Sequence, residues 1–336
     1  MHAVSLCALE AELPGRQVGD AELAAEHDVP ESEIARWSKG RVRFESDQGQ
    51  GPAVLLAAAT RRMLERRGLA VADIDFLVAA TNTPDMFFPG SGCTLQSALG
   101  APPFGALDVR ANCTGFLVAL DVGSRFVASG RYRRVLVATA DVPSHMNRRD
   151  GISPELGFGM SDGACAVLVE RGSAATDVLS VRVHTDGSRA YDYFCEFPAS
   201  RFRQGDSLQG RNRLPADKVA EGLHYPRADV EALRELARTR VPAVFEEALA
   251  AANVEQVDAT LVAHLLPDVE EELGQRLGAR AGRIIRPDML YCAGSSLAIL
   301  LARAASDGRV QPGQTIALAT SGSGASWGAA VLRCPS

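Results

Sequence analysis

The fold is decided by two similar stretches of sequence, Asp75-Phe-Leu-Val-Ala-Ala-Thr81 and Asp258-Ala-Thr-Leu-Val-Ala-His264. In each, an aspartate leads into a short, continuous apolar run, and a helical stretch comes before it, at residues 52–67 and 241–252. Continuous apolar runs of this length between helical stretches are typical of strands buried on both faces of a sheet, as in layered α/β proteins.

The similarity continues downstream of both stretches. In each half a Gly-Arg turn precedes an apolar run, at 135–139 in the first half and 316–320 in the second. One further apolar run follows in each, at 162–169 and 326–332. We therefore predict two similar α/β halves, 1–172 and 173–336, packed face to face with helices between them and a site at the seam. The segment 187–228 breaks the repeat and is expected to be an excursion that covers a pocket.

Composition narrows the class of protein. The chain has 336 residues, 46% of them hydrophobic, which is enough for a large core, and its net charge of −6 argues against a nucleic-acid binder. It has no apolar run long enough to span a membrane and no signal peptide, so we expect a soluble cytosolic protein. Seven cysteines without a CxxC pair indicate free thiols, and we expect neither a metal nor a cofactor.

Cys113 is the cysteine whose position indicates chemistry. A strand over 106–111 leads into Asn112-Cys-Thr-Gly115, and an apolar helical stretch follows from Phe116 to Ala128. At a helix start, free N–H groups and the positive end of the helix dipole favour the thiolate, so we expect a lowered pKa and a nucleophilic sulfur. The alternative is a structural cysteine in a tight turn.

His264 ends the second-half strand where Thr81 ends the first-half strand, so we expect it at the sheet end that presents Cys113. It is either a structural histidine or the partner base. Asp268 follows closely enough to fold back and orient the imidazole, as the third member of a catalytic triad does. The alternative for Asp268 is a helix N-cap.

Two further features have both a functional and a structural explanation. The loop Ser321-Gly-Ser-Gly324 lies between two strand-like runs, and its small residues suit a backbone N–H aimed at an oxyanion. Clustered arginines are either solvated faces or a docking surface for an acidic partner; the candidates are Arg61, Arg62, Arg66, Arg67, Arg148 and Arg149.

Four motifs together resemble the 3-oxoacyl-ACP synthase III family of the thiolase superfamily: residues 79–89, 112–116, 158–164 and 324–329. The resemblance implies a thiolase-like α/β fold with α-β-α-β-α layers and a homodimer. It implies Cys113 as the acylated residue, His264 as the catalytic histidine and an oxyanion hole from the N–H groups of Cys113 and Ser323. Phe88 matches a phenylalanine that reaches into the neighbouring subunit, and we expect Met86, Phe87 and Phe88 to shape the acyl pocket.

The sequence departs from the family at Tyr291. Counting back from Asp307, Tyr291 stands where the family has an asparagine that, with the histidine, holds the malonyl thioester oxygen during decarboxylation. Losing one donor of this kind typically costs about 100- to 1000-fold in rate. We therefore expect decarboxylative condensation to be disfavoured.

A second departure concerns the acyl donor. Family members that use CoA carry a tryptophan and an arginine that stack the adenine; the equivalent window, residues 31–40, offers Ile34 and Ser38, or Glu33 and Trp37 one residue earlier. The clamp is lost in both registers, so we infer an acyl carrier protein donor with a phosphopantetheine arm.

The function expected from the sequence is acyl transfer. Cys113 takes an acyl group from a carrier thioester, and His264 acts as a general base on a hydroxyl, amine or carrier-thiol acceptor, in natural-product (polyketide) biosynthesis and without decarboxylation. One alternative is a starter-unit synthase in which Tyr291 replaces the asparagine. Another is a catalytically silent partner of a synthase complex.

Overall fold

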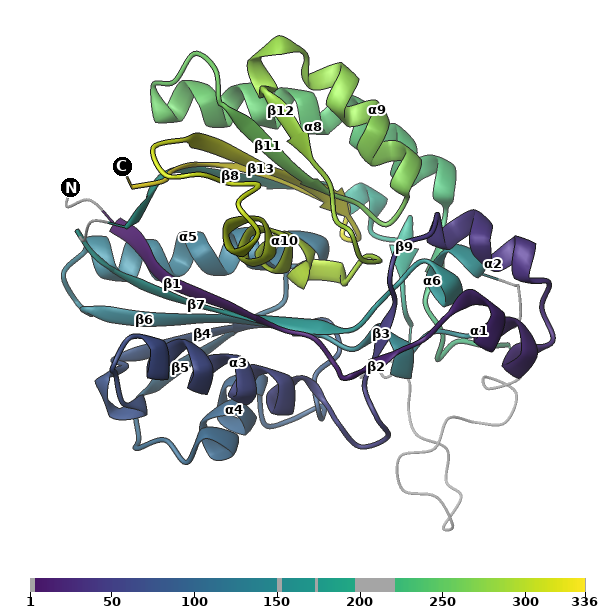
Figure 1. Ribbon diagram of the computed structural model, residues 1–336, viewed down its shortest axis with the longest axis horizontal. Coiled ribbons are helices and arrows are strands. Elements are labelled where there is room, and N and C mark those ends of the chain that lie inside the picture. Colours follow the sequence, from purple (N-terminus) through teal and green to yellow (C-terminus); the bar gives the residue numbers. More distant parts are fainter. Residues whose placement is uncertain (1–3, 150–152, 173–174, 197–220, 336) are drawn as a thin grey trace.

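One arrangement of five strands occurs twice in the chain (Figure 1). The computed structural model describes residues 4–149, 153–172, 175–196 and 221–335. The first half has the strand order β5-β4-β6-β7-β1, and the second half has the same order with β12-β11-β13-β14-β8. In both halves the first three strands run parallel and the other neighbours antiparallel. The repeat read from the sequence is therefore a duplicated fold.

The strands of each half are short and continuous. In the first half they are β1 (Val4–Glu12), β4 (Phe76–Ala80), β5 (Gly105–Val109), β6 (Arg134–Asp141) and β7 (Gly163–Arg171). In the second half they are β8 (Thr176–Thr185), β11 (Ala259–Ala263), β12 (Arg283–Ile285), β13 (Thr315–Gly322) and β14 (Ser326–Arg333). A short pairing of β1 with β8 joins the halves into one ten-stranded ladder.

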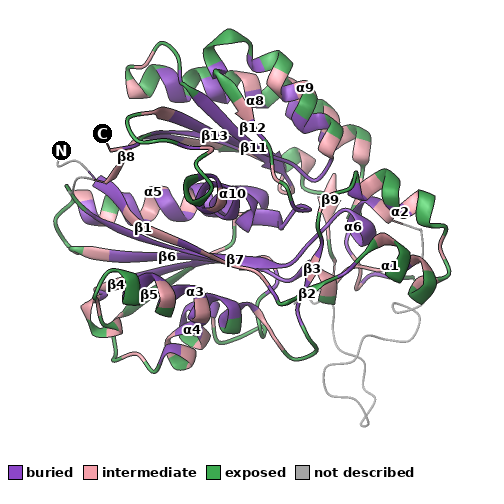
Figure 2. Ribbon diagram, viewed as in Figure 1, coloured by how far each residue is buried: buried purple, intermediate pink, exposed green. Residues whose placement is uncertain are grey.

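Helices separate and cover the two sheets. Figure 1 shows α5 (Gly115–Ala128) and α10 (Ser296–Ser306) between the sheets. The outer faces are covered by α3 (Pro52–Arg66) and α4 (Ser91–Leu99) on the first half, and by α8 (Val230–Ala252) and α9 (Pro267–Leu277) on the second. This gives the α-β-α-β-α layers of a thiolase-like fold, and Figure 2 shows the strands buried along most of their length.

The remaining elements are small and lie near one end of the sheets (Figure 1). They are α1 (Asp20–His27), α2 (Glu31–Ser38), α6 (Pro154–Phe158), the β2/β3 pair (Arg16–Gln17 and Phe44–Glu45) and the β9/β10 pair (Tyr193–Phe194 and Arg227–Ala228). In the described part of the chain, no helix is long and apolar enough to cross a bilayer.

The repeated aspartates explain why the two halves begin their parallel strands alike. The Asp75 carboxylate accepts the backbone N–H groups of Arg133 and Arg134 at 2.8 Å, and the Asp258 carboxylate accepts the N–H of Thr315 at the same distance. Each aspartate thus fixes the register of the first strand after the helix against the strand beside it. Since both pairings are made at the start of a parallel pair, the carboxyl ends of the strands emerge together at the opposite edge.

Two turns at that opposite edge lead into the central helices. The 3₁₀ turn η2 (Asn112–Thr114) precedes α5, and η6 (Ala293–Ser295) precedes α10. Both begin with a non-glycine residue in the left-handed region, Asn112 at φ 48° and Ala293 at φ 42°. Such conformations are strained for side chains with a Cβ and are concentrated at functional sites.

Candidate active site

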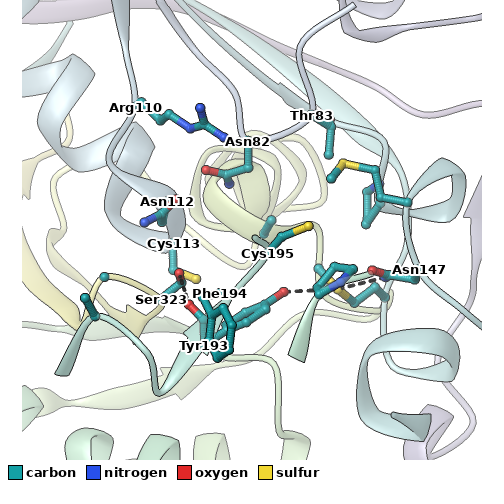
Figure 3. Close-up of a pocket in the computed structure, with 17 residues that line it drawn as sticks. Asn82, Thr83, Arg110, Asn112, Cys113, Asn147, Tyr193, Phe194, Cys195 and Ser323 are labelled. Atoms are coloured by element: carbon teal, nitrogen blue, oxygen red, sulfur yellow. Dashed lines mark hydrogen bonds between the residues drawn. The ribbon is translucent and has the colours of Figure 1, made fainter. Parts of the chain in front are cut away.

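The Cys113 thiol opens onto a cavity of about 380 Å³ near the carboxyl ends of the first-half strands (Figure 3). Its lining includes Asn82, Thr83, Arg110, Asn112, Asn147, Met160, Tyr193, Phe194, Cys195, Ser323 and Gly324. Part of the excursion expected to cover a pocket does line this cavity, namely Ala190, Tyr193, Phe194, Cys195 and Pro226. Residues 197–220 of that excursion lie outside the described part of the chain.

Cys113 is held tightly at the floor of the cavity. Its side chain is buried, with 6% of the residue exposed, and it is the second residue of η2 rather than the first residue of the helix. Gly322, the last residue of β13, passes so close that a Cβ on it would lie 2.3 Å from Cys113 Sγ. Only glycine fits there, which explains the small residues of the 321–324 loop.

The electrostatics of Cys113 differ from the sequence-based expectation. Burial raises the pKa of the thiol, and the Tyr291 hydroxyl and the Ser323 N–H oppose that rise only in part. The expected stabilisation of the thiolate by a helix start is outweighed because the cysteine is buried and because the Asp141 carboxylate lies nearby. Cys113 is therefore a neutral thiol in the resting site.

Ser323 is positioned by the excursion. Its hydroxyl donates a 2.6 Å hydrogen bond to the Tyr193 carbonyl of β9, and its N–H points toward Cys113 Sγ, as does the N–H of Cys113 itself. These are the two N–H groups that the family resemblance implies for an oxyanion hole. Tyr193 itself was not expected at the site; its ring lines the cavity (Figure 3).

His264 follows β11 directly, beside Ser321 of the parallel strand β13. Its Nδ1 accepts the backbone N–H of Leu266 at 3.0 Å, so the neutral ring carries its proton on Nε2. Nε2 is buried and has no hydrogen-bond partner among the described residues. Burial lowers the pKa of His264 to about 4, so the ring is a neutral hydrogen-bond donor at physiological pH.

Asp268 does not orient the histidine in this structure, contrary to the triad expected from the sequence. The N–H of Leu266 already occupies Nδ1, and the Asp268 carboxylate is half-exposed and paired with Arg234. The N-cap of α9 is Leu266, so Asp268 is not the N-cap either; it is an acidic residue in the first turn of the helix.

Glu270 is the carboxylate that does support His264, and the sequence-based interpretation did not include it. One of its oxygens accepts the backbone N–H of His264 at 2.9 Å, and the other pairs with Arg41. Glu270 is completely buried, and burial raises its pKa to about 7 despite the opposing arginine. Its position six residues after the histidine, one helical turn into α9, was the only available signal.

Tyr291 reaches Cys113 although it lies two residues before η6 begins. Its ring is buried, and its pKa is raised well above the ordinary value by burial and by the neighbouring Cys113 sulfur. The hydroxyl lies beside Cys113 and Thr320 but makes no hydrogen bond of good geometry with the described residues. Ser321 Oγ is also buried without a partner. Unpaired buried donors of this kind are costly unless a ligand satisfies them.

The cavity reaches Cys113 but neither His264 nor Tyr291, the two residues with an unpaired donor beside it. Both are absent from the cavity lining. They are also almost completely buried, with 1% and 2% of the residues exposed. A group bound in this cavity therefore contacts Cys113 but not His264 or Tyr291.

Asp141 joins the two halves beneath Cys113. It ends β6, and its carboxylate accepts the N–H of Asn82 at 2.7 Å and both the N–H and the hydroxyl of Ser295 at 3.2 and 2.9 Å. Burial raises the pKa of Asp141 to about 7. A polar residue that closes a buried strand was a usable signal, but the sequence-based interpretation did not use it.

The residues proposed for the acyl pocket lie elsewhere. Met86, Phe87 and Phe88 are 47%, 65% and 76% exposed and do not line the cavity of their own chain. The residues that follow them contact β5, since the Gly92 N–H donates to Asp108 at 3.1 Å, and β5 is an edge strand whose residues are largely exposed. The expectation that these three shape the pocket therefore does not hold within one chain.

Most of the candidate docking arginines have internal partners. Arg62 pairs with Glu10 and Glu12, Arg66 with Glu10, Arg67 with Glu170 and Arg149 with Glu45. Arg61 donates to the Ala98 carbonyl, and Arg148 lies over the Tyr225 ring. These partners neutralise much of the positive charge that the sequence suggested for docking.

The window compared with the CoA clamp forms α2. Ile34 and Ser38 are buried, and the Ser38 hydroxyl donates to Asp20. Trp37 packs half-buried against the core with Arg36 over its ring. Neither register presents a tryptophan and an arginine ready to stack an adenine.

Comparisons with known proteins identify relatives of this chain. Residues 107–187 match the family model of 3-oxoacyl-[acyl-carrier-protein (ACP)] synthase III, and residues 246–334 match its C-terminal model. The chain is 30% identical to Beta-ketoacyl-[acyl-carrier-protein] synthase III of Synechococcus sp. (strain RCC307) over 338 residues, covering 99% of this chain and 98% of the relative. It is 32% identical to the protein of that name from Synechococcus elongatus, covering 89% and 87%.

Solved structures agree on the fold. The crystal structure of 3-oxoacyl-(acyl carrier protein) synthase III from Pseudomonas aeruginosa PAO1 superimposes with a TM-score of 0.85 at 22% identity, covering 99% of both chains. At that identity the likeness shows the fold.

Gly322→Ala should disable acylation of Cys113 while leaving the fold intact. The added Cβ must displace the sulfur, and a misplacement of about 1 Å at a reacting atom costs on the order of 100-fold. Intact-mass measurement of acyl loading from a thioester donor reports the rate. Gly15→Ala is the matched control, because a Cβ at Gly15 meets nothing within 4 Å. Equal loading by both variants would contradict the close contact.

Alkylation of Cys113 should become faster up to high pH. Because burial raises the pKa of Cys113, its thiolate fraction should still be growing at the alkaline end of the range. Iodoacetamide labelling followed by peptide mass analysis between pH 6 and 10 measures this, with the exposed Cys93 as an internal reference. A plateau below pH 8 would show that the thiolate is stabilised after all.

Proposed function

Because this chain belongs to the 3-oxoacyl-[acyl-carrier-protein] synthase III family, we propose that it is a condensing synthase. Cys113 takes an acyl group from a thioester donor and joins it to a malonyl unit on an acyl carrier protein, with loss of carbon dioxide. The observation that carries this proposal is the hydrogen bond from Leu266 N–H to His264 Nδ1. The names of the relatives, all Beta-ketoacyl-[acyl-carrier-protein] synthase III, also favour it.

The hydrogen bond at Nδ1 supports one of two roles for His264. A general base needs a free lone pair on Nε2, which would put the proton on Nδ1 and break the bond from Leu266. A pKa near 4 also makes the ring a weak base. A donor role needs only the Nε2–H that the ring already has. The proposal therefore differs from the expectation based on the missing asparagine, which put acyl transfer, with His264 as a general base, ahead of condensation.

In the first step, Cys113 Sγ attacks the carbonyl carbon of the acyl thioester. The N–H groups of Cys113 and Ser323 hold the developing oxyanion. The carbon–sulfur bond to the donor then breaks, and the donor thiol leaves with the proton that Cys113 gives up. The acyl chain occupies the cavity beside Cys113.

In the second step, the malonyl thioester loses carbon dioxide and becomes an enolate. His264 Nε2–H and the Tyr291 hydroxyl, both unpaired among the described residues, donate to the enolate oxygen. The enolate carbon attacks the acyl carbonyl, and the Cys113 thiolate leaves to give the 3-oxoacyl product. Tyr291 thus supplies the hydrogen bond that an asparagine supplies in the wider family.

One observation favours a second candidate function, acyl transfer without decarboxylation. The cavity gives access to Cys113 but not to His264 or Tyr291, so the malonyl group has no preformed place between the donors. An acceptor that needs only the acylated sulfur would meet no such obstacle.

Carbon dioxide release separates the two functions. Acyl-loaded enzyme given a malonyl-carrier should release one carbon dioxide per 3-oxoacyl-carrier formed. Gas capture measures the carbon dioxide, and intact mass measures the product on the carrier. Tyr291→Phe should lower this rate about 100- to 1000-fold by removing one enolate donor, while Cys113 still loads. Tyr291→Asn should keep far more activity than Tyr291→Phe, because the amide restores a donor. Loading without any carbon dioxide release would reject condensation and leave transfer to a hydroxyl, amine or thiol.

We further propose that the protein acts as a homodimer and receives its substrates from an acyl carrier protein. Support for the dimer comes from β5, an edge strand with exposed backbone, and from the exposed Met86, Phe87 and Phe88 beside it. Free edges and exposed aromatic clusters are usually covered by a partner. Support for the carrier comes from the family and from the lack of an adenine clamp in α2.

Replacing Phe88 by Ser together with Leu107 by Lys should dissociate the dimer. The first change removes an exposed anchor, and the second places a charge on the exposed β5 edge, so we expect at least a tenfold weaker association. Light scattering after size exclusion measures the mass. Val42→Ser, an exposed apolar residue between α2 and β3, is the control. A wild-type monomer at micromolar concentration would reject the dimer.

A further inference from the structure

The cavity beside Cys113 has an unusual charge balance. The described residues that line it include one arginine, Arg110, and no aspartate or glutamate. Three asparagines, Asn82, Asn112 and Asn147, add polar side chains to the same walls. A purely aliphatic acyl chain would leave Arg110 and Asn112 without partners, whereas an anionic group would find a cation and no opposing carboxylate in the described lining.

Arg110 is free to receive a ligand. Many arginines of this chain pair with a carboxylate, as Arg62 does with Glu10. Arg110 makes no hydrogen bond or ion pair with any described residue. Asn112, which lies two residues further on, has no side-chain partner among these residues either. By contrast, Asn147 Nδ2 is already held by the Leu156 carbonyl at 2.7 Å, and Asn82 is held by Asp141.

The position of Arg110 limits which part of a substrate it meets. It lies three residues before Cys113 in the strand-to-turn connection, so the two Cα atoms are at most about 11 Å apart. Figure 3 shows Arg110 and Asn82 on the same side of the cavity as Asn112 and Cys113. A phosphopantetheine phosphate is held much further from its sulfur, at the far end of the extended arm. A group a few bonds beyond the acyl carbonyl is within reach.

We propose that the acyl group carried by Cys113 is short and ends in a carboxylate, which Arg110 binds. This substrate class rests on the proposed acylation of Cys113, a step shared by condensation and transfer. The chemistry is thioester exchange: Cys113 Sγ bonds to the carbonyl carbon, the donor carbon–sulfur bond breaks, and the donor thiol leaves with the cysteine proton. The distal carboxylate takes no part in bond changes and forms a charge-assisted pair with the guanidinium.

Three matched donors test the proposal: the pantetheine thioesters of succinate, succinamate and 4-methylpentanoate. They have similar shapes but end in a carboxylate, a neutral amide and an apolar branch. Loading of Cys113 is measured as mass gain of the intact protein over time, without any acceptor. We expect succinyl to load at least about tenfold faster than 4-methylpentanoyl at low donor concentration, with succinamoyl between them.

Variants assign the preference to one side chain. Arg110→Met should abolish the advantage of succinyl over succinamoyl, and Arg110→Lys should restore part of it. Arg133→Met is the control, because Arg133 is exposed at the opposite end of β6 and should leave the ratio unchanged. Salt should reduce the succinyl advantage in the wild-type protein.

Each outcome bears on a different statement. Loading of all three donors at similar rates, or a preference that survives Arg110→Met, would overturn the carboxylate specificity while acylation of Cys113 stands. No mass gain from any donor, with Cys113 intact, would overturn acylation and with it the specificity. Carbon dioxide release is not part of this measurement, so the result does not depend on whether the enzyme condenses or transfers.

Discussion

The contact between the turns that begin α5 and α10 is the constraint on which the site depends. A Cβ on Gly294 would lie 2.4 Å from the Asn112 carbonyl oxygen, so the second-half turn must be glycine where it meets the first. Asp141 then bridges the halves by accepting N–H groups from Asn82 and Ser295. Gly322 packs against the sulfur from the other side, so contacts from both halves hold Cys113 in place.

Burial, more than ion pairing, sets the chemistry of this site. It holds Cys113 as a thiol and His264 as a neutral ring, and it raises the pKa values of Asp141 and Glu270 to about 7. A site of this kind has few charges of its own to screen a developing anion. Stabilisation therefore has to come from oriented donors whose direction is fixed in advance, which is what the Leu266 bond does for His264. Glu270 contributes by fixing the backbone of the same residue.

Sequence periodicity predicted the duplicated sheets because each buried strand needs a continuous apolar run, and the aspartates before β4 and β11 make the repeat visible. It also predicted that Cys113 and His264 each follow a strand, and they follow β5 and β11. It failed where the answer depends on enclosure. The helix-start argument for Cys113 ignored how completely Gly322 and its neighbours exclude solvent. The sequence argument chose Asp268 because it is close to His264 along the chain, and it did not consider Glu270, which a helix that starts at Pro267 turns inward.

The same limits apply to surfaces. Clusters of arginine are visible in the sequence, but their partners come from β1, β3 and β7, which lie far away along the chain. Arg110 was overlooked because it stands alone. Its significance depends on the cavity beside it and on the absence of acidic residues from the described lining.

The duplicated frame carries one reactive and one unreactive copy of the same turn. In η2 and η6 the second residues are Cys113 and Gly294, each preceded by a residue in the left-handed region. The two halves are thus similar in backbone but differ in side chain at this turn: the first copy carries the proposed nucleophile, and the second has a glycine where the two turns meet. The second half therefore contributes to the site by its shape, since its glycine leaves the space that the turn around Cys113 occupies.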